Sequence, residues 1–522
     1  MKRSSWLPLA TLLTAACALA FYAPRLASEQ PQPYSRSRWI AEGMRRGVHY
    51  SGGIVPGGPT PALEALIAQP WEEPKRGGQA GGEPPGPRNT RVSLDVLPPD
   101  SSSAAQRETE AEPYLAADPA DAKRLLAFYQ EDRFADGGGG ARALTYAVSA
   151  DGGRHWREGP LPQLTAASGG AFERASDPWV AYGPGHVAYA SGLAFDETDP
   201  AGGVYVSTSR DGGESWGAPV AVHQQDGNTI DDKDAVVVDN HPHSPFFGRV
   251  YVGWDISPND PAQPQVLSIA SSLDEGATFG PPVTIFAAGG NLGVLPLVGA
   301  DGTVYVVWLH FDADNTTWIA SSYSTDGGNS WSPAAKVADV IIAPVQSSRT
   351  GDGLPSAALD PTTGHLYVVW QDQRFTPGTV QVAMTVSADG KGGWSAPRRI
   401  SDGPNGAASF TPSVAASAQG QVAVGWYTFR NSPHGNNLEV DEYLSLGGPR
   451  GRPFSRGRRQ STASWDNRAA AIAGGKFFLG DYQGLAATAA GVFFPLWVAT
   501  AAPSRIDPPA RQPDVYTLAV GR

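Results

Sequence analysis

The sequence of 522 residues contains very little cysteine and few charged residues. Its single cysteine, Cys17, excludes an intrachain disulfide and a zinc site built on cysteines. Lys and Arg number 39 against 51 Asp and Glu, and the net charge of -12 argues against a surface that binds nucleic acid. Stability must therefore come from packing, and an anionic ligand would need arginines that converge locally.

Long apolar runs are also scarce, because no stretch after residue 22 could span a bilayer. Two basic residues precede an apolar stretch at 6–22, and Ala-Leu-Ala at 18–20 offers a cleavage site, which is the layout of a secretory signal peptide. Residues 14–17 also resemble a bacterial lipobox, and an uncleaved anchor is a third alternative. We expect residues 1–22 to direct a bacterial protein to the periplasm, the cell surface or the medium.

Glycine and proline are abundant, with 62 and 46 residues, yet they stay below the level of low-complexity disorder. Many of them fall in residues 23–89, which we expect to be a linker. Trp39, Ile40, Met44 and Val48 recur there at helical spacing and predict one short helix. Beyond the linker, 15 Trp, 17 Tyr and 18 Phe provide enough apolar surface for a large β-rich core.

A strand that ends in or near an aromatic residue recurs roughly every 60 residues from residue 120 onward. The seven strands are expected at Leu125–Tyr129, Val187–Ser191, Val250–Trp254, Val304–Trp308, Leu366–Trp370, Val422–Trp426 and Val492–Trp497. Sequence repeats of this length indicate one fold built from similar units. The chain therefore holds one large all-β domain at 90–522 rather than three separate domains.

A second motif follows each of the first five strands. Its copies are Ser149–Trp156, Ser209–Trp216, Ser272–Phe279, Ser324–Trp331 and Ser387–Trp394. In each copy an Asp can accept hydrogen bonds from backbone N–H groups two residues on, Gly supplies a positive φ, and the final aromatic packs beneath the turn. We expect these Asp residues to stabilise hairpins and not to act in catalysis.

These hairpin motifs resemble the Asp-box, or bacterial neuraminidase (BNR) repeat, of the sialidase superfamily. The resemblance implies a β-propeller whose Asp-boxes lie on the outer rim, away from a ligand site at the mouth of the central channel. Sialidases have six blades, whereas the seven strand units favour seven blades here, with six as the alternative. Residues 90–96 are then expected to pair with 515–520 and close the ring.

Charged residues recur where the units should meet the channel mouth. The starts of the expected innermost strands carry Glu112, Asp177, Asp232 and Asp352, and the loops after the second strands carry Arg133, Arg374 and Arg430. A guanidinium binds a carboxylate through two parallel hydrogen bonds, so converging arginines would suit an anionic sugar or a peptide carboxylate. In the alternative interpretation, each arginine pairs with a neighbouring Asp and ties blades together.

The resemblance also implies a catalytic Tyr that is activated by a nearby Glu. Tyr482, beside Asp481, resembles this nucleophile, with Glu112 or Glu131 as its partner, so Asp481, Tyr482 and Glu112 are the candidate catalytic residues. We expect an exported, monomeric, sialidase-like propeller that binds a glycan or another small polar ligand, and glycoside hydrolysis of the exo-sialidase type is one activity that such a site would allow. The alternative is a non-catalytic binding or scaffold propeller on the cell surface. No cofactor is expected, although Asp231, Asp232 and Asp234 offer a calcium site at the mouth.

Overall fold

The computed structural model describes residues 34–45, 61–67, 86–136, 138–260, 262–314, 316–432, 437–448, 453–500 and 512–521. The expected signal segment at 1–22, including Cys17, lies outside the described residues. No helix within the described ranges is long and apolar enough to cross a bilayer.

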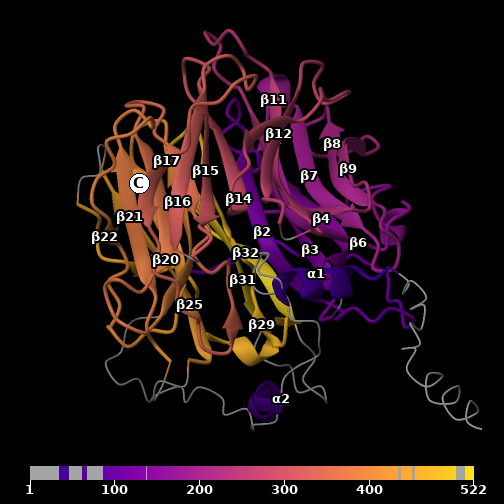
Figure 1. Ribbon diagram of the computed structural model, residues 1–522. Helices are drawn as coiled ribbons and strands as arrows, with labels where there is room; N and C mark the ends of the chain where they lie inside the picture. Colours follow the sequence, from indigo (N-terminus) through magenta and orange to yellow (C-terminus); the bar gives the residue numbers. More distant parts are fainter. Residues whose placement is uncertain are drawn as a thin grey trace, which may run out of the picture.

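The described residues form four-stranded antiparallel units that follow one another along the chain (Figure 1). The first two units are β2 (Glu110–Ala117), β3 (Leu125–Arg133), β4 (Ala141–Ser149) and β5 (Arg157–Pro160), then β6 (Arg174–Tyr182), β7 (Ala188–Phe195), β8 (Gly202–Ser209) and β9 (Val220–Gln224). A single residue pair, Ala141 opposite Ala175, joins these two units into one continuous sheet.

Four further units continue the same order. They are β10 (Thr229–Val238), β11 (Val250–Pro258), β12 (Val266–Ser272) and β13 (Val283–Phe286); β14 (Gly290–Val298), β15 (Val304–Phe311), β16 (Thr317–Ser324) and β17 (Ala335–Asp339); β19 (Ser356–Leu359), β20 (Leu366–Asp372), β21 (Gln381–Ser387) and β22 (Arg398–Arg399); and β23 (Ser409–Ala416), β24 (Val422–Thr428), β25 (Glu439–Gly447) and β26 (Arg458–Arg459). A short strand, β27 (Trp465–Asp466), also pairs with β25.

The last unit joins the two ends of the described chain. It consists of β30 (Gly484–Ala487), β31 (Phe493–Thr500), β32 (Pro513–Thr517) and, at its edge, β1 (Thr90–Arg91). Thr90 lies opposite Thr517 and Arg91 opposite Tyr516, which is the closure expected from the sequence, over a shorter stretch. Segments from opposite ends of the sequence therefore lie side by side, indigo against yellow in Figure 1.

The second strand of each unit forms the core. β3, β7, β15, β20, β24 and β31 are buried at every position, as expected for strands that pack against neighbouring sheets on both faces. The aromatic residues predicted near the strand ends are among the largest fully buried side chains, for example Trp254, Trp308 and Trp370. The predicted core strands are thus present.

The five predicted hairpin motifs all form tight turns. In each, the serine hydroxyl accepts a hydrogen bond from a glycine N–H, as Ser324 does from Gly328 at 2.9 Å. The Asp carboxylates of the first four accept N–H groups three or four residues on and not two, as Asp326 does from Asn329 and Ser330. The terminal aromatics pack against core clusters, so these motifs stabilise hairpins as expected.

The first strands of the seven units surround one cavity of about 380 Å³. Five of these strands bulge at an equivalent residue that has a positive φ, namely Glu112, Asp177, Lys233, Gly293 and Thr411. Sheets arranged with their first strands around a common channel form a β-propeller. The chain is therefore nearly all β, with an architecture that matches the expected fold class.

Two helices from the expected linker pack on this body. α1 (Arg36–Arg45) overlaps the stretch predicted to be helical, whereas α2 (Pro61–Ile67) was not predicted. Ile40 of α1 is 2% exposed and Leu63 of α2 is 3% exposed. The described parts of the linker are therefore docked on the propeller, in contrast to the expected simple tether.

Candidate functional site: a charged cluster beneath α1

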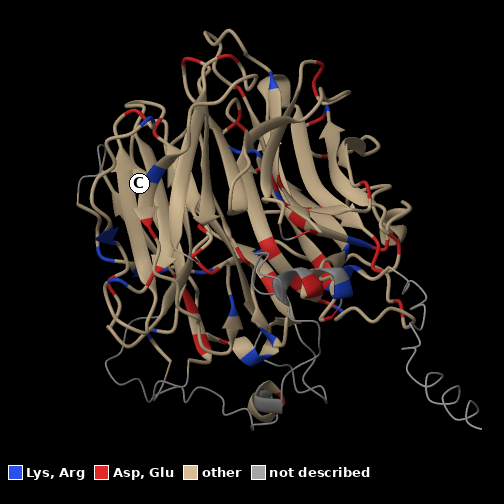
Figure 2. Ribbon diagram, in the orientation of Figure 1, with Lys and Arg blue, Asp and Glu red and all other residues tan. Residues whose placement is uncertain are grey.

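Lys233 is the centre of a buried ionic cluster where the first strands begin. Its Nζ atom lies 2.6 Å from Asp177 Oδ1, 3.2 Å from Asp481 Oδ2 and 3.4 Å from Glu112 Oε1. The lysine is only 5% exposed, and the three acids are 1–3% exposed. Figure 2 shows acidic and basic segments close to one another beside α1. Residues that the sequence placed on separate units are thus brought together.

Two arginines complete the cluster. Arg349 donates to Asp481 at 2.7 Å, while Arg133 reaches Glu112 through the side-chain amide of Gln130. Arg133 and Arg349 also stack on the ring of Phe478, at 4.3 and 4.6 Å from its centroid. The cluster therefore pairs three cations with three carboxylates in a region shielded from water.

Arg349 and Phe478 come from a short sheet that interrupts the repeat. This sheet comprises β18 (Ser348–Arg349), β28 (Ala471–Ala473) and β29 (Lys476–Phe478), with β18 parallel to β29. The segment from Trp465 to Phe478 accounts for the longest interval between repeated strands. Because it lies between units, its residues have no counterpart in the repeat.

The electrostatics differ within the cluster: burial raises the pKa of Glu112 and of Asp177 although Lys233 lowers both, whereas Lys233 and Asp481 are held in their ionised forms. Burial lowers the pKa of Lys233, but Asp177, Glu112 and Asp481 outweigh it and hold this pKa well above its ordinary value. Burial also raises the pKa of Asp481, yet Arg349 and Lys233 hold it well below the usual range. A general acid or base works best with a pKa near the operating pH. The Lys233–Asp481 pair is instead a stable ion pair at neutral pH.

Tyr482 belongs to the cluster but lacks the predicted activating partner. Its hydroxyl donates to the backbone carbonyl of Pro178 at 3.3 Å, and its ring lies 5.3 Å from Lys233 Nζ. Burial raises its pKa well above the ordinary value, and the charge of Glu112 raises it further. Glu112 binds Lys233 and Gln130 instead. Glu131 accepts from Thr145 and from the N–H of Leu97. The expected Tyr–Glu contact is therefore absent from the described residues.

α1 covers the cluster on its outer side. The Arg36 backbone N–H donates to the carbonyl of Glu197 at 2.8 Å, and its guanidinium reaches the carbonyl of Asp231 at 3.3 Å and stacks on Phe195. Ser37 donates to the Glu197 carboxylate through its backbone and its hydroxyl. A space of only about 30 Å³, lined by Arg36 and Ile40, remains between α1 and the cluster. α1 thus closes this end of the channel.

The cavity of about 380 Å³ lies on the other side of the cluster. Lys233, Asp481 and Tyr482 form one end, and the cavity runs along the first strands to Ala117 and Leu359. Its aromatic wall consists of Tyr114 and Trp179, stacked with centroids 3.6 Å apart, and Tyr482, which meets Trp179 edge-on. Aliphatic side chains form most of the remaining wall, and its other polar positions are Asp234, Ser356, Gln371, Thr411, Ser413 and Gln483.

Two of the three predicted arginines do not join the cluster. Arg374 pairs with Asp372 at 2.8 Å and packs near Trp370. Arg430 pairs with Asp402 at 3.0 Å and stacks over Tyr443. Only Arg133 reaches the mouth, so the expected convergence of all three is wrong and the alternative of local Asp pairing holds for two of them. Each guanidinium binds an Asp close to it, Asp372 for Arg374 and Asp402 for Arg430, and therefore does not reach the channel.

The other predicted acids lie at the edge of the cluster. Asp232 accepts from the backbone N–H of Lys233 at 3.1 Å and lines the space beneath α1. Asp352 lies near the mouth, where burial raises its pKa and the charge of Asp481 raises it further. The sequence interpretation missed Lys233 and Arg349. For Lys233 a signal was available, because a lysine occupies the position that carries an acid in the two preceding units.

The predicted calcium site does not form. Asp231 accepts from His223 at 2.8 Å and Asp234 from Ser191 at 2.5 Å, so the two carboxylates have separate partners. Within the described part of the chain, one group of three acids is close enough to share a metal ion, and it lies elsewhere.

No protein-family model and no curated protein matches the chain. A protein of unknown function from Dyadobacter fermentans is similar in structure, with 13% identity and a TM-score of 0.42 over 62% of this chain and 91% of that one. An alpha-L-arabinanase from Penicillium chrysogenum, complexed with arabinobiose, has 13% sequence identity and a TM-score of 0.43. The match covers 66% of this chain and 93% of that one. A sialidase from Streptococcus pneumoniae has 11% sequence identity and a TM-score of 0.42. The match covers 83% of this chain and 70% of that one. The fold assignment therefore rests on the sheets of this chain itself.

Proposed function

We propose that this protein is a binding propeller that holds a small, neutral, polyhydroxylated ligand, such as a sugar unit, in its central channel without turning it over. The observation that carries the proposal is the charge balance of the Lys233 cluster. Its three carboxylates all bind Lys233, and Asp481 also binds Arg349, so cations inside the cluster engage each acid. These ion pairs stabilise the fold at one end of a cavity of about 380 Å³, which is large enough for a small ligand.

The same balance argues against an anionic ligand. A carboxylate-bearing sugar would need an arginine or lysine with unsatisfied charge, but Lys233 and Arg349 are already paired with acids. Additional carboxylates nearby, such as Asp232 and Asp352, make this end of the channel more negative. A neutral ligand meets no such electrostatic penalty.

Polar groups along the cavity support a ligand with hydroxyl groups. Thr411 Oγ1, Ser413 Oγ and Gln483 Oε1 are buried and have no hydrogen-bond partner within the described protein. Unpaired buried polar atoms are costly unless a water or a ligand satisfies them. Rotation of these side chains would present them to a sugar, whose apolar face would pack on the aromatic wall.

A glycoside hydrolase of the exo-sialidase type is the second candidate. It is favoured by the grouping of Tyr482, Asp481 and Glu112 with two arginines in one cluster. In this alternative α1 must leave the mouth, and Tyr482 must exchange Pro178 for an acidic partner. Under the same proposal the five hairpins are Asp-boxes of the sialidase superfamily.

The remaining expectations extend this proposal. We infer that the seven units are seven blades of a closed ring at 90–522, preceded by a signal or lipoprotein signal at 1–22 and a linker at 23–89. The protein would be exported, as a monomer, to the periplasm, the cell surface or the medium. The support is the order of the sheets and the sequence pattern of the first residues.

A paired measurement of binding and turnover tests the proposal. Calorimetric titration with a panel of neutral monosaccharides should detect at least one ligand, whose affinity falls about tenfold in Thr411→Val or Ser413→Ala, since each loses one hydrogen bond. Thr208→Val, on the outer part of the propeller, should leave affinity unchanged. Fluorogenic glycosides, including a sialoside, should not be hydrolysed by the full chain or by Ile40→Asp, which weakens α1 docking. Hydrolysis by Ile40→Asp alone would favour the second candidate.

A further inference from the structure

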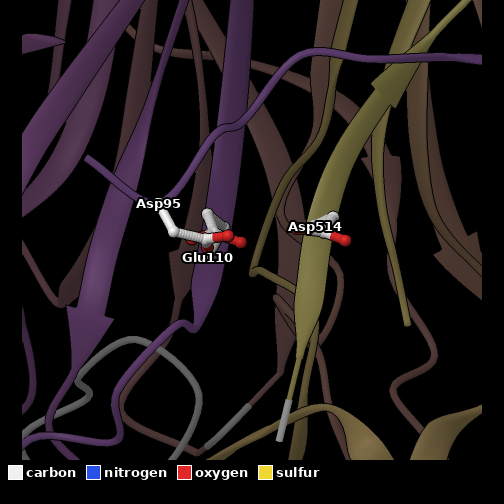
Figure 3. Close-up of side chains that lie close together, drawn as sticks. All are labelled: Asp95, Glu110 and Asp514. Atoms are coloured by element: carbon white, nitrogen blue, oxygen red, sulfur yellow. The ribbon is translucent and has the colours of Figure 1, made fainter. Parts of the chain in front are cut away.

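Three acidic side chains meet where the ends of the described propeller join, far along the sequence from one another. Asp95 follows β1, Glu110 begins β2 and Asp514 lies on β32 (Figure 3). One carboxylate oxygen from each lies within 4.8 Å of the others. Asp95 is partly exposed, whereas Glu110 and Asp514 are buried. The group is therefore a buried site with one side open to solvent.

Glu110 is the unusual member of this group. Its side chain is 0% exposed, and neither carboxylate oxygen has a hydrogen-bond partner within the described residues. Buried carboxylates are normally paired, hydrogen-bonded or bound to a metal. Both oxygens of Glu110 are therefore available to a ligand that enters beside Asp95 and Asp514.

The group has more negative than positive charge, and a divalent cation would balance the excess. Arg91 is the cation that contacts it, binding Asp95 at 2.5 Å and Asp514 at Oδ1. Three carboxylates against one guanidinium leave two negative charges. Arg91 pairs with Oδ2 of Asp95 and with Oδ1 of Asp514, whereas among the described residues neither oxygen of Glu110 has a hydrogen-bond partner. Tyr516 donates to the other Asp514 oxygen at 3.3 Å.

Two neighbouring glutamates hold the loop that carries Asp95. Glu158 accepts from the backbone N–H of Leu94 at 2.6 Å, and Glu131 accepts from that of Leu97 at 2.9 Å. These bonds fix the backbone on both sides of Asp95. The ligand oxygens are thus positioned by β2, by β32 and by a loop that is anchored on either side.

We propose that Asp95, Glu110 and Asp514 bind a calcium ion that joins the N-terminal and C-terminal strands of the ring. All available donors are hard oxygen atoms, and water can complete the coordination on the open side. Ca²⁺ accepts six to eight such ligands in variable geometry, whereas Mg²⁺ requires a near-ideal octahedron. The ion would tie β2 and the loop after β1 to β32 at the point where the ring closes.

Terbium luminescence and thermal unfolding of the full chain test this site. Tb³⁺ replaces Ca²⁺ and would be excited through Tyr516, which contacts Asp514. We expect tyrosine-sensitised emission that Ca²⁺ displaces, and a Tm about 3 °C higher in calcium at roughly 100-fold above Kd than in chelator. Both effects should disappear in Glu110→Gln and persist in Glu214→Gln, which removes a partly exposed acid elsewhere.

The possible outcomes separate the alternatives. If Glu110→Gln fails to fold, Asp95→Asn takes its place, because the Asp95 side chain is 30% exposed and tolerates substitution. Absence of emission together with equal Tm values in calcium and chelator would overturn the proposal, and Glu110 would then be a neutral buried acid. Emission and Tm shifts that survive both substitutions would also overturn it, because the ion would bind elsewhere.

Discussion

Lys233 occupies a position that is acidic in the two preceding units. Glu112, Asp177 and Lys233 are the bulged, positive-φ residues of three successive first strands, so their side chains converge. A repeat with acids at all three positions would bury like charges side by side. The single basic residue turns this repulsion into an ion-pair network, to which Asp481 and Arg349 are added.

Replacing Lys233 should therefore be severe. Lys233→Met leaves three buried carboxylates without their shared cation, and we expect a loss of about 3–5 kcal/mol in the free energy of unfolding. Arg430→Met removes a partly exposed pair and should cost about 1 kcal/mol or less. Denaturant unfolding measures both. Similar losses of unfolding free energy in the two variants would contradict the stabilising role assigned to Lys233.

The sequence predicts only part of this cluster. Glu112, Asp177 and Asp481 could be placed at the mouth because the repeat aligns the starts of the first strands. Arg349 could not, because it reaches the mouth through a parallel pairing with Phe478 that lies outside the repeat. A repeat also does not predict which acid an arginine will bind. Arg374, for example, pairs with Asp372 and not with an acid of the cluster.

At the scale of the element, the hairpin motifs follow local rules and were predicted well. Hydrogen bonds from the Ser330 hydroxyl and N–H lower the pKa of Asp326 from 3.8 to about 2. The charged carboxylate therefore adds stability that is fully present above about pH 4 and is lost as the pH falls through about 2. The short first-strand bulges, by contrast, depend on packing around the channel and were not predicted.

Asp326→Asn should accordingly lower stability at pH 5, by about 1 kcal/mol, because a weaker acceptor replaces the carboxylate. The difference between wild type and variant should shrink as the pH falls from 4 to 2. Chemical unfolding across this pH range checks the trend, with Asp136→Asn, an exposed position outside the motifs, as the control. A difference that is constant with pH would contradict the assigned role of the charge.

At the scale of the molecule, the repeat predicted a nearly all-β body, and the pairing of residues from both ends was predicted as well. Val515 is 0% exposed and accepts the Val92 N–H at 2.7 Å. The inserted sheet and the docking of α1 were not predictable, since both depend on contacts between segments outside the repeat. Closure makes the stability of the ring depend on a single terminal strand.

A charge in that strand should therefore destabilise the whole domain. Val515→Asp buries an unpaired carboxylate at the seam, and we expect a loss of about 4 kcal/mol or more. Ala519→Asp, at an exposed position of the same segment, should change stability by less than about 0.5 kcal/mol. Calorimetry measures both, and equal Tm values would mean that the terminal strand does not hold the ring closed.

Ligand-observed NMR of the full chain with neutral aryl glycosides tests both parts of the proposed function, which are binding of a neutral sugar in the channel and the absence of hydrolysis. We predict saturation transfer from protein to sugar protons, which needs about tenfold more ligand for the same signal in Ser413→Ala, and no product signals after prolonged incubation. Product signals that disappear in Tyr482→Phe, or no saturation transfer to any sugar, would contradict the proposed function.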